Sequence, residues 1–269
     1  MMLKTITSKE NKTLKEVRSL LSKKGRDKEN LFIVEGYKFI FSDSLYKPKY
    51  IIFSEETYEN VLLENPDISN VQCDIYIVPK DIFKTLTDTE TPQGSLCVFH
   101  FNNTIKNDVI DLLKEKENLS ILVCEEMQDP GNCGTIIRTA DAAAFDMCIF
   151  TEKSVDYYNP KAVRSSAGSI LNIPCFYFKT SMEVIELLKE FEITTYGTFL
   201  NTNLYYDSIK YPKKTAFFLG NEANGLKDTT INMLETLVKI PILGKAESLN
   251  VSIAGSLMIY EILKQNKLY

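Results

Sequence analysis

The first hundred residues alternate between helical and extended hydrophobic patterns. Leu14, Val17, Leu20 and Leu21 recur at helical spacing, with lysines largely on the other faces. Short apolar runs then predict strands over 30–36, 50–53, 74–78 and 95–99, with a helix over 37–44. This order predicts a small α/β unit at the start of the chain.

The rest of the chain repeats the alternation with more uniformly apolar strands. The polar stretch 102–118 is expected to be a linker that runs into a helix. Beyond it we expect strands over 119–124, 147–150, 175–178, 194–198, 215–219 and 237–240, and helices over 135–144, 161–169, 181–191 and 251–264. Such a pattern is typical of a parallel sheet covered on both faces, which binds ligands at the carboxyl ends of its strands. We therefore predict an α/β protein with domains at 1–105 and 106–269.

The charge of the chain is unevenly distributed. The net charge is −5, but residues 1–50 hold 12 Lys or Arg against 6 Asp or Glu, which is +6 there and leaves −11 for the remainder. A basic N-terminal part on an acidic body suggests a contact with RNA or DNA. A solvated helix face explains the same charges equally well.

Cysteine and histidine usage narrows the chemistry. The six cysteines form no C-x-x-C pair and several lie in apolar runs, so we expect reduced, mostly buried thiols of a cytoplasmic protein. His100 is the only histidine, which predicts no metal site and excludes Ser-His and Cys-His catalysis that does not use it. The N-terminus lacks the apolar run of a signal peptide and no segment is long enough to span a bilayer, so we expect a soluble, unexported protein without a membrane partner.

The segment Asp129–Ala140 is the first of three strand-to-loop junctions with unusual polar residues. Its two glycines allow the backbone to approach a ligand closely. We place Arg138 on the first turn of the following helix, where the helix dipole disfavours a cation unless it faces a phosphate or substrate. On this segment alone an ordinary exposed arginine is the simpler interpretation. A second strand ending at Glu152 imitates a dinucleotide-binding unit, but the G-x-G-x-x-G fingerprint is absent.

The other two junctions carry the same kind of residues. In Ala216–Leu226 a buried strand opens into a loop rich in Gly and Asn, with Glu222 just beyond the strand end. In Ile240–Val251 a strand leads through a glycine loop to a helix that Ser248 or Asn250 can cap. Plain turns and caps explain each segment singly, whereas three such junctions indicate one shared pocket.

Together these segments resemble the three motifs of the SpoU/TrmH branch of the SPOUT RNA methyltransferases. The matching residues are Asn132, Gly134 and Arg138, then Leu219–Glu222 with Gly225 and Leu226, then Ile240, Pro241, Gly244 and Ser248–Val251. Arg164–Gly168 resembles another recurring stretch of the family. The N-terminal part is similar to the family's substrate-binding domain, which has an L30e-like fold, at Arg26, Phe32, Glu35, Gly36 and Thr91–Gly94.

The resemblance, which spans nearly the whole chain, implies a deep trefoil knot in the C-terminal domain and a homodimer formed through it. It further implies S-adenosylmethionine as cofactor, with structured ribosomal or transfer RNA as the partner methylated on a ribose 2′-hydroxyl. Cofactor binding would fall to Leu219, Gly220, Asn221, Ile240, Ser248 and Leu249, and the catalytic pocket to Arg138, Asn132, Glu222, Ser248 and Asn250.

Two questions stay open at this point. The family proposal makes Arg138 the base, but a guanidinium is normally protonated, so Arg138 could instead stabilise the developing alkoxide. A catalytically silent RNA-binding protein of the same fold is the alternative function, against which the intact motif residues argue. A dinucleotide-dependent oxidoreductase ranks third because its fingerprint fails.

Overall fold

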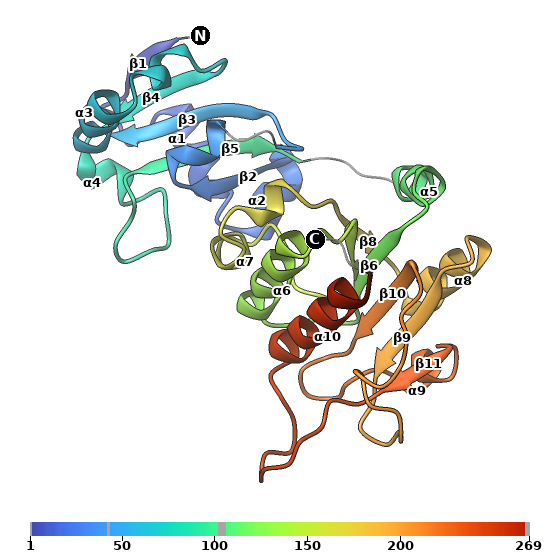
Figure 1. Ribbon diagram of the computed structural model, residues 1–269. Coiled ribbons are helices and arrows are strands. Elements are labelled where there is room, and N and C mark those ends of the chain that lie inside the picture. Colours follow the sequence, from blue (N-terminus) through green and yellow to red (C-terminus); the bar gives the residue numbers. More distant parts are fainter. Residues whose placement is uncertain (1, 42–43, 102–105, 267–269) are drawn as a thin grey trace. The chain divides into compact units, whose positions relative to one another are not determined.

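The structure is a computed structural model that describes residues 2–41, 44–101 and 106–266, without the side chains of 106 and 107. The chain forms two compact units, each described here by itself (Figure 1). The N-terminal unit consists of Met1–Asn102 with Tyr158–Arg164, and the C-terminal unit of Asn103–Tyr157 with Ser165–Tyr269.

The N-terminal unit is built on a five-stranded mixed sheet of order β1-β4-β3-β5-β2. β3 runs parallel to β4, and β5 is antiparallel to both of its neighbours. Its elements are β1 (Leu3–Thr5), α1 (Lys12–Ser19), α2 (Lys23–Glu29), β2 (Leu31–Glu35), η1 (Tyr37–Phe41), β3 (Pro48–Ser54), α3 (Glu55–Glu64), η2 (Pro66–Asn70), β4 (Asp74–Val78), α4 (Lys80–Phe83) and β5 (Ser95–His100).

The core of this unit confirms the helical stripe predicted near the N-terminus. Leu14, Val17 and Leu20 are fully buried against one face of the sheet. The stripe belongs to α1 and to the residues directly after it, and the second short helix, α2, ends at Asn30 in a left-handed conformation. Arg26 is buried as well, with its guanidinium donating to the carbonyl of Leu20 at 2.8 Å.

Tyr158–Arg164 packs with the N-terminal unit although it lies far along the chain. The Tyr158 ring is stacked on Phe101 at 4.4 Å and contacts Phe32 at 4.5 Å, and its hydroxyl lies 3.0 Å from that of Tyr46. Arg164, near the end of α7 (Pro160–Ser165), forms an ion pair with Asp88. The predicted boundary near residue 105 did not anticipate that this segment completes the N-terminal unit.

The C-terminal unit is built on a six-stranded sheet of order β11-β9-β10-β6-β7-β8 in which every pairing is parallel, as the sequence predicts. Its other elements are α5 (Lys106–Glu115), β6 (Leu119–Cys124), α6 (Pro130–Ala142), β7 (Met147–Thr151), η3 (Ser169–Leu171), β8 (Cys175–Phe178), α8 (Ser181–Glu190), β9 (Thr194–Thr198), β10 (Lys214–Leu219), α9 (Asp228–Ile231), β11 (Thr236–Val238) and α10 (Val251–Asn266).

Helices cover this sheet on both faces. Ile121 and Val123 of β6 belong to a core shared with α5 and α8. On the other face α6 and α10 lie side by side (Figure 1). They approach closely at Gly255, where an added Cβ would lie 2.5 Å from Leu219 and 2.6 Å from Ile136. The knot implied by the resemblance stays a prediction.

The expected state of the cysteines is confirmed, since all six are buried thiols. Burial raises the pKa of Cys97, and that of Cys124, above the ordinary value for a thiol, so neither is a reactive nucleophile.

Candidate active site at the carboxyl edge of the parallel sheet

The three junctions singled out in the sequence meet at one edge of the C-terminal sheet. Because β6, β10 and β9 run parallel and neighbour one another, the loops that follow them leave the sheet on the same side. The loop after β11 joins them, since β11 pairs with β9. The structure therefore brings segments more than a hundred residues apart into one site.

A cavity of about 380 Å³ lies among these loops, within the roughly 300–1,000 Å³ range of small-molecule sites. Its lining contains all six residues that the family resemblance implies for cofactor binding, namely Leu219, Gly220, Asn221, Ile240, Ser248 and Leu249. Two of the five predicted catalytic residues, Glu222 and Ser248, also line it. Its lining has more apolar than polar side chains, which suits an adenosyl group held largely by backbone atoms.

The cavity wall after β10 is a tight turn that depends on its two glycines, Gly220 and Gly225. Asn221 and Gly225 exchange two backbone hydrogen bonds of 2.9 Å, and the Asn221 carboxamide oxygen accepts from the backbone of Ala223 and Asn224. Gly225 has a φ of +68°, and a Cβ on Gly220 would lie 2.0 Å from the backbone of Gly225. The Gly-Asn composition therefore shapes this wall of the cavity.

A chain of hydrogen bonds links the three junctions beside the cavity. The Glu222 carboxylate accepts from the backbone of Gln128 and Asp129 at 3.1 Å each, and from Asn132 Nδ2 at 3.2 Å. Asn132 Oδ1 in turn accepts from Asn250 Nδ2 at 3.0 Å. One predicted residue from each segment thus contributes to a continuous polar chain.

The charge of Glu222 is stabilised by this arrangement. Partial burial by itself raises the pKa of the carboxyl group. The hydrogen bonds from Asp129, Gln128 and Asn132 together lower the pKa by more than burial raises it, so the pKa lies below its ordinary value. Glu222 is therefore ionised at neutral pH, and it fixes the loop that begins α6.

Asn250 begins helix α10. Its side-chain oxygen accepts from the backbone of Ser252 at 2.9 Å and of Ile253 at 3.3 Å, while its carbonyl accepts from Ala254. Of the two caps that the sequence offered, Asn250 is the one used. Its amide group remains free to donate to Asn132, so one side chain ends the third junction and binds the first.

The position of Arg138 corrects one prediction. Helix α6 begins at Pro130 with Asp129 as its N-cap, rather than at residue 135, so Arg138 lies eight residues inside the helix and not on its first turn. The two glycines belong to the helix itself, and the argument from the dipole does not apply. Arg138 is exposed, does not line the cavity, and has no hydrogen-bond or ion-pair partner among the residues that the structure describes.

The sequence reading missed several residues of the site. Thr198–Asn201 and Lys239 line the cavity, and Ser252 donates to the Asn250 oxygen at 2.6 Å. For Thr198–Asn201 and Lys239 the places at the ends of β9 and β11 were a usable signal, because those ends lie at the same edge of the sheet. Within the described ranges, no cluster of three His, Cys, Asp or Glu could hold a metal ion. No helix there is long and apolar enough to cross a membrane.

Comparison with solved structures places this architecture in a known class. The chain superposes on an AdoMet-bound rRNA methyltransferase from Sinorhizobium meliloti with a TM-score of 0.82, at 27% identity over 99% of both chains. A structure described as an RNA 2′-O ribose methyltransferase gives a TM-score of 0.79 at 26% identity, covering 98% of this chain and all of that one. The fold is that of the SPOUT RNA methyltransferases.

Sequence comparison then gives the family. Residues 120–260 match the SpoU rRNA Methylase family, and residues 11–97 match the MRM3-like substrate binding domain. The chain is 33% identical to the 23S rRNA (guanosine(2553)-2′-O)-methyltransferase RlmP of Bacillus subtilis, over 97% of this chain and 99% of that one. The chain belongs to the SpoU rRNA methylase family, as its motifs predict.

Proposed function

We propose that this protein transfers a methyl group from S-adenosylmethionine to the 2′-hydroxyl of a guanosine ribose in large-subunit ribosomal RNA, in the cytoplasm. The observation that carries the proposal is the cavity at the carboxyl edge of the parallel sheet, with the Glu222–Asn132–Asn250 chain beside it. The kind of nucleotide is inferred from the name of the Bacillus subtilis relative.

The cavity residues fit an adenosyl ligand. When bound, S-adenosylmethionine would supply a methyl group on a positively charged sulfur: the ribose oxygen would bond to the methyl carbon as the carbon–sulfur bond breaks, and S-adenosylhomocysteine would leave. Leu219, Ile240 and Leu249 offer apolar contacts, and the exposed stretch Glu222–Asn224 of the turn offers backbone carbonyl groups as hydrogen-bond acceptors. The protein's main contribution to the rate is then to hold the ribose oxygen in line with the methyl group.

Arg138 is proposed to act on the RNA rather than on the cofactor. Its guanidinium is exposed and without a partner among the described residues, so it can meet the target ribose and its phosphate. A protonated guanidinium is suited to stabilise the oxygen as it loses its proton, while another group accepts that proton. Arg138→Ala is expected to abolish methyl transfer with unchanged binding of S-adenosylhomocysteine, and lost cofactor binding would contradict this role.

The N-terminal unit is proposed to hold the RNA. It matches a substrate-binding domain, and Lys12, Lys15, Lys23 and Lys24 are exposed on its first two helices. Because the same helices bury core residues, deleting them would unfold the unit, and replacing the lysines by glutamate is the better test. RNA affinity should then fall and its salt dependence should weaken.

A homodimer formed through α10 is the proposed assembly. Ile253, Leu257 and Tyr260 recur at helical spacing along one face, with exposed fractions of 52%, 37% and 50%. Three large apolar side chains that are exposed next to one another on a surface helix are typical of an interface, and we expect a second copy of the chain to cover them.

The test is calorimetric titration with S-adenosylhomocysteine, followed by transfer of labelled methyl groups to ribosomal RNA from cells that lack the gene. We expect one site per chain and a single new 2′-O-methylated nucleotide, absent from RNA of those cells. An absence of binding in the presence of RNA would refute the proposal and favour a silent RNA-binding protein.

A further inference from the structure

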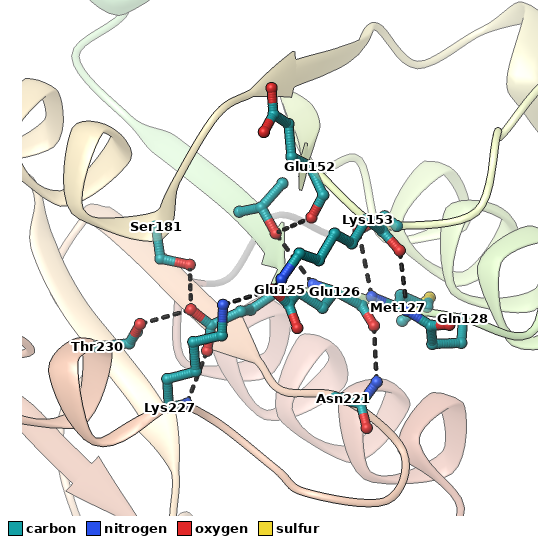
Figure 2. A network of polar contacts seen from close by, with 12 residues as sticks. Glu125, Glu126, Met127, Gln128, Glu152, Lys153, Ser181, Asn221, Lys227 and Thr230 are labelled. Carbon is teal, nitrogen blue, oxygen red and sulfur yellow. Dashed lines mark hydrogen bonds and ion pairs between the residues drawn. The ribbon is translucent and has the colours of Figure 1, made fainter.

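Both ends of the cavity-lining loop Asn221–Lys227 are attached to the dipeptide Glu125–Glu126, which follows β6 (Figure 2). At the start of the loop, Asn221 Nδ2 donates to the carbonyl of Glu126 at 2.9 Å. At its end, the backbone of Lys227 donates to Glu125 Oε2 at 2.8 Å. The shape of this cavity wall therefore depends on two residues that do not line the cavity themselves.

Glu125 is a rigid anchor. Its side chain is buried, and its carboxylate also accepts from Ser181 Oγ at 2.7 Å and from Thr230 Oγ1 at 2.5 Å. A buried carboxylate is tolerated only when hydrogen bonds satisfy it, so these donors hold it in one position.

Glu126 has an unusual backbone and a double ion pair. Its φ is +50°, a left-handed conformation that favours glycine, and its amide donates to Thr151 Oγ1 at 3.0 Å. Its carboxylate forms ion pairs with Lys227 and, at 3.5 Å, with Lys153, whose own φ is +70°. The hydrogen bond from Lys227 is the largest cause that lowers the pKa of Glu126 below its ordinary value, so the group stays charged.

We propose that Glu126 is a positioning residue, whose carboxylate acts through Lys227 to hold the loop Asn221–Lys227 in the shape that binds the adenosyl ligand. The inference rests on the proposed function. A glycine would adopt the left-handed backbone more easily than glutamate. The side chain must therefore contribute something that a glycine cannot, and the ion pairs with Lys227 and Lys153 are that contribution.

The experiment compares Glu126→Gln, Glu126→Gly, Lys227→Met and the double variant Glu126→Gln/Lys227→Met in the full-length protein. S-adenosylhomocysteine affinity is measured by calorimetry at low and high salt, beside the melting temperature. We expect both Glu126 variants to bind about two- to tenfold more weakly at low salt, the range of two partly exposed ion pairs. The double variant should bind no more weakly than either single one.

Two further readouts separate positioning from simple stability. Glu126→Gly should melt no lower than the wild type, because it relieves the left-handed backbone while it removes the ion pairs. The wild type should lose affinity with salt more steeply than the variants, since both lysines are more than half exposed, at 73% and 51%.

The outcomes are distinguishable. Wild-type affinity in both Glu126 variants would overturn the inference alone, as would losses of affinity that follow the melting temperature. No binding by the wild type would overturn the proposed function, and this inference with it.

Discussion

Replacing Asn250 tests whether the polar chain beside the cavity is needed for catalysis or only for folding. In Asn250→Ala two functions are lost together. The backbone amides of Ser252 and Ile253 lose their cap, and Asn132 Oδ1 loses its nearer donor, at 3.0 Å, and keeps Ser252 Oγ at 3.4 Å. The start of α10 and the link to the first junction are therefore both weakened.

The size of the effect follows from these contacts. Loss of an N-cap costs about 0.5–2 kcal/mol, and loss of one hydrogen bond costs about 0.5–1.5 kcal/mol. Asn250 is exposed, so the lower part of the combined range applies, about 1–2 kcal/mol. For a domain of this size that corresponds to a fall in melting temperature of roughly 2–8 °C.

Asn250→Asp separates the two functions. A carboxylate still caps the helix and is favoured at its N-terminus, so the melting temperature should fall by less than about 2 °C. The donor to Asn132 is lost, however, and Asn132 could donate to the new carboxylate only by turning its carbonyl oxygen toward Glu222. We expect methyl transfer to fall at least about tenfold, equivalent to about 1.4 kcal/mol, in both variants.

The measurements are thermal melting by circular dichroism and initial rates of methyl transfer at saturating S-adenosylmethionine. Full activity in Asn250→Asp would refute the role of the link to Asn132. A melting temperature as low as that of Asn250→Ala would refute the assignment of the cap.

Three further predictions concern the same unit. Because the pKa of Glu222 is lowered in the folded state, the stability that the carboxylate provides is present above its ordinary pKa of 4.5 and is lost as the pH falls through the lower pKa of the folded state. The difference in melting temperature between the wild type and Glu222→Gln should therefore shrink in acid. An unchanged difference would contradict this. Gly220→Ala should abolish S-adenosylhomocysteine binding, because the added Cβ would lie 2.0 Å from backbone atoms of Gly225. Gly225→Ala meets open space but must keep a φ of +68°, so it should cost only about 1–2 kcal/mol of stability. Equal binding by the two variants would show that the turn is not needed. Tyr260→Asp should convert the dimer to a monomer in sedimentation analysis, and a dimer of unchanged stability would exclude α10 from the interface.

The sequence predicted the C-terminal sheet well because its strands are buried on both faces. Apolar runs such as 119–124 and 175–178 coincide with β6 and β8. Elements with little burial were missed: β1 is wholly exposed, and α3 buries only Val61. Without a buried face, neither helical nor strand periodicity is visible in the hydrophobic pattern.

The start of α6 shows how a local signal was misinterpreted. Asp129 followed by Pro130 is a strong N-terminal signature, but Gly131 and Gly134 suggested a turn instead. Tertiary packing overrides the low helix propensity of these glycines, since Gly134 is buried. The Glu125–Glu126 attachment was invisible for another reason: its partners, such as Lys227, lie about a hundred residues away along the chain.

The return of Tyr158–Arg164 to the N-terminal unit limits how the protein can be divided. A fragment ending near residue 101 would lack the ring that covers Phe32 and Phe101, and it would expose an apolar surface to water. A fragment starting at 106 would carry the matching segment without its binding partner. The N-terminal substrate-binding unit is therefore discontinuous in sequence, and recombination at a single crossover point cannot exchange it whole. A chimera with a relative should exchange Tyr158–Arg164 together with it, as one discontinuous module.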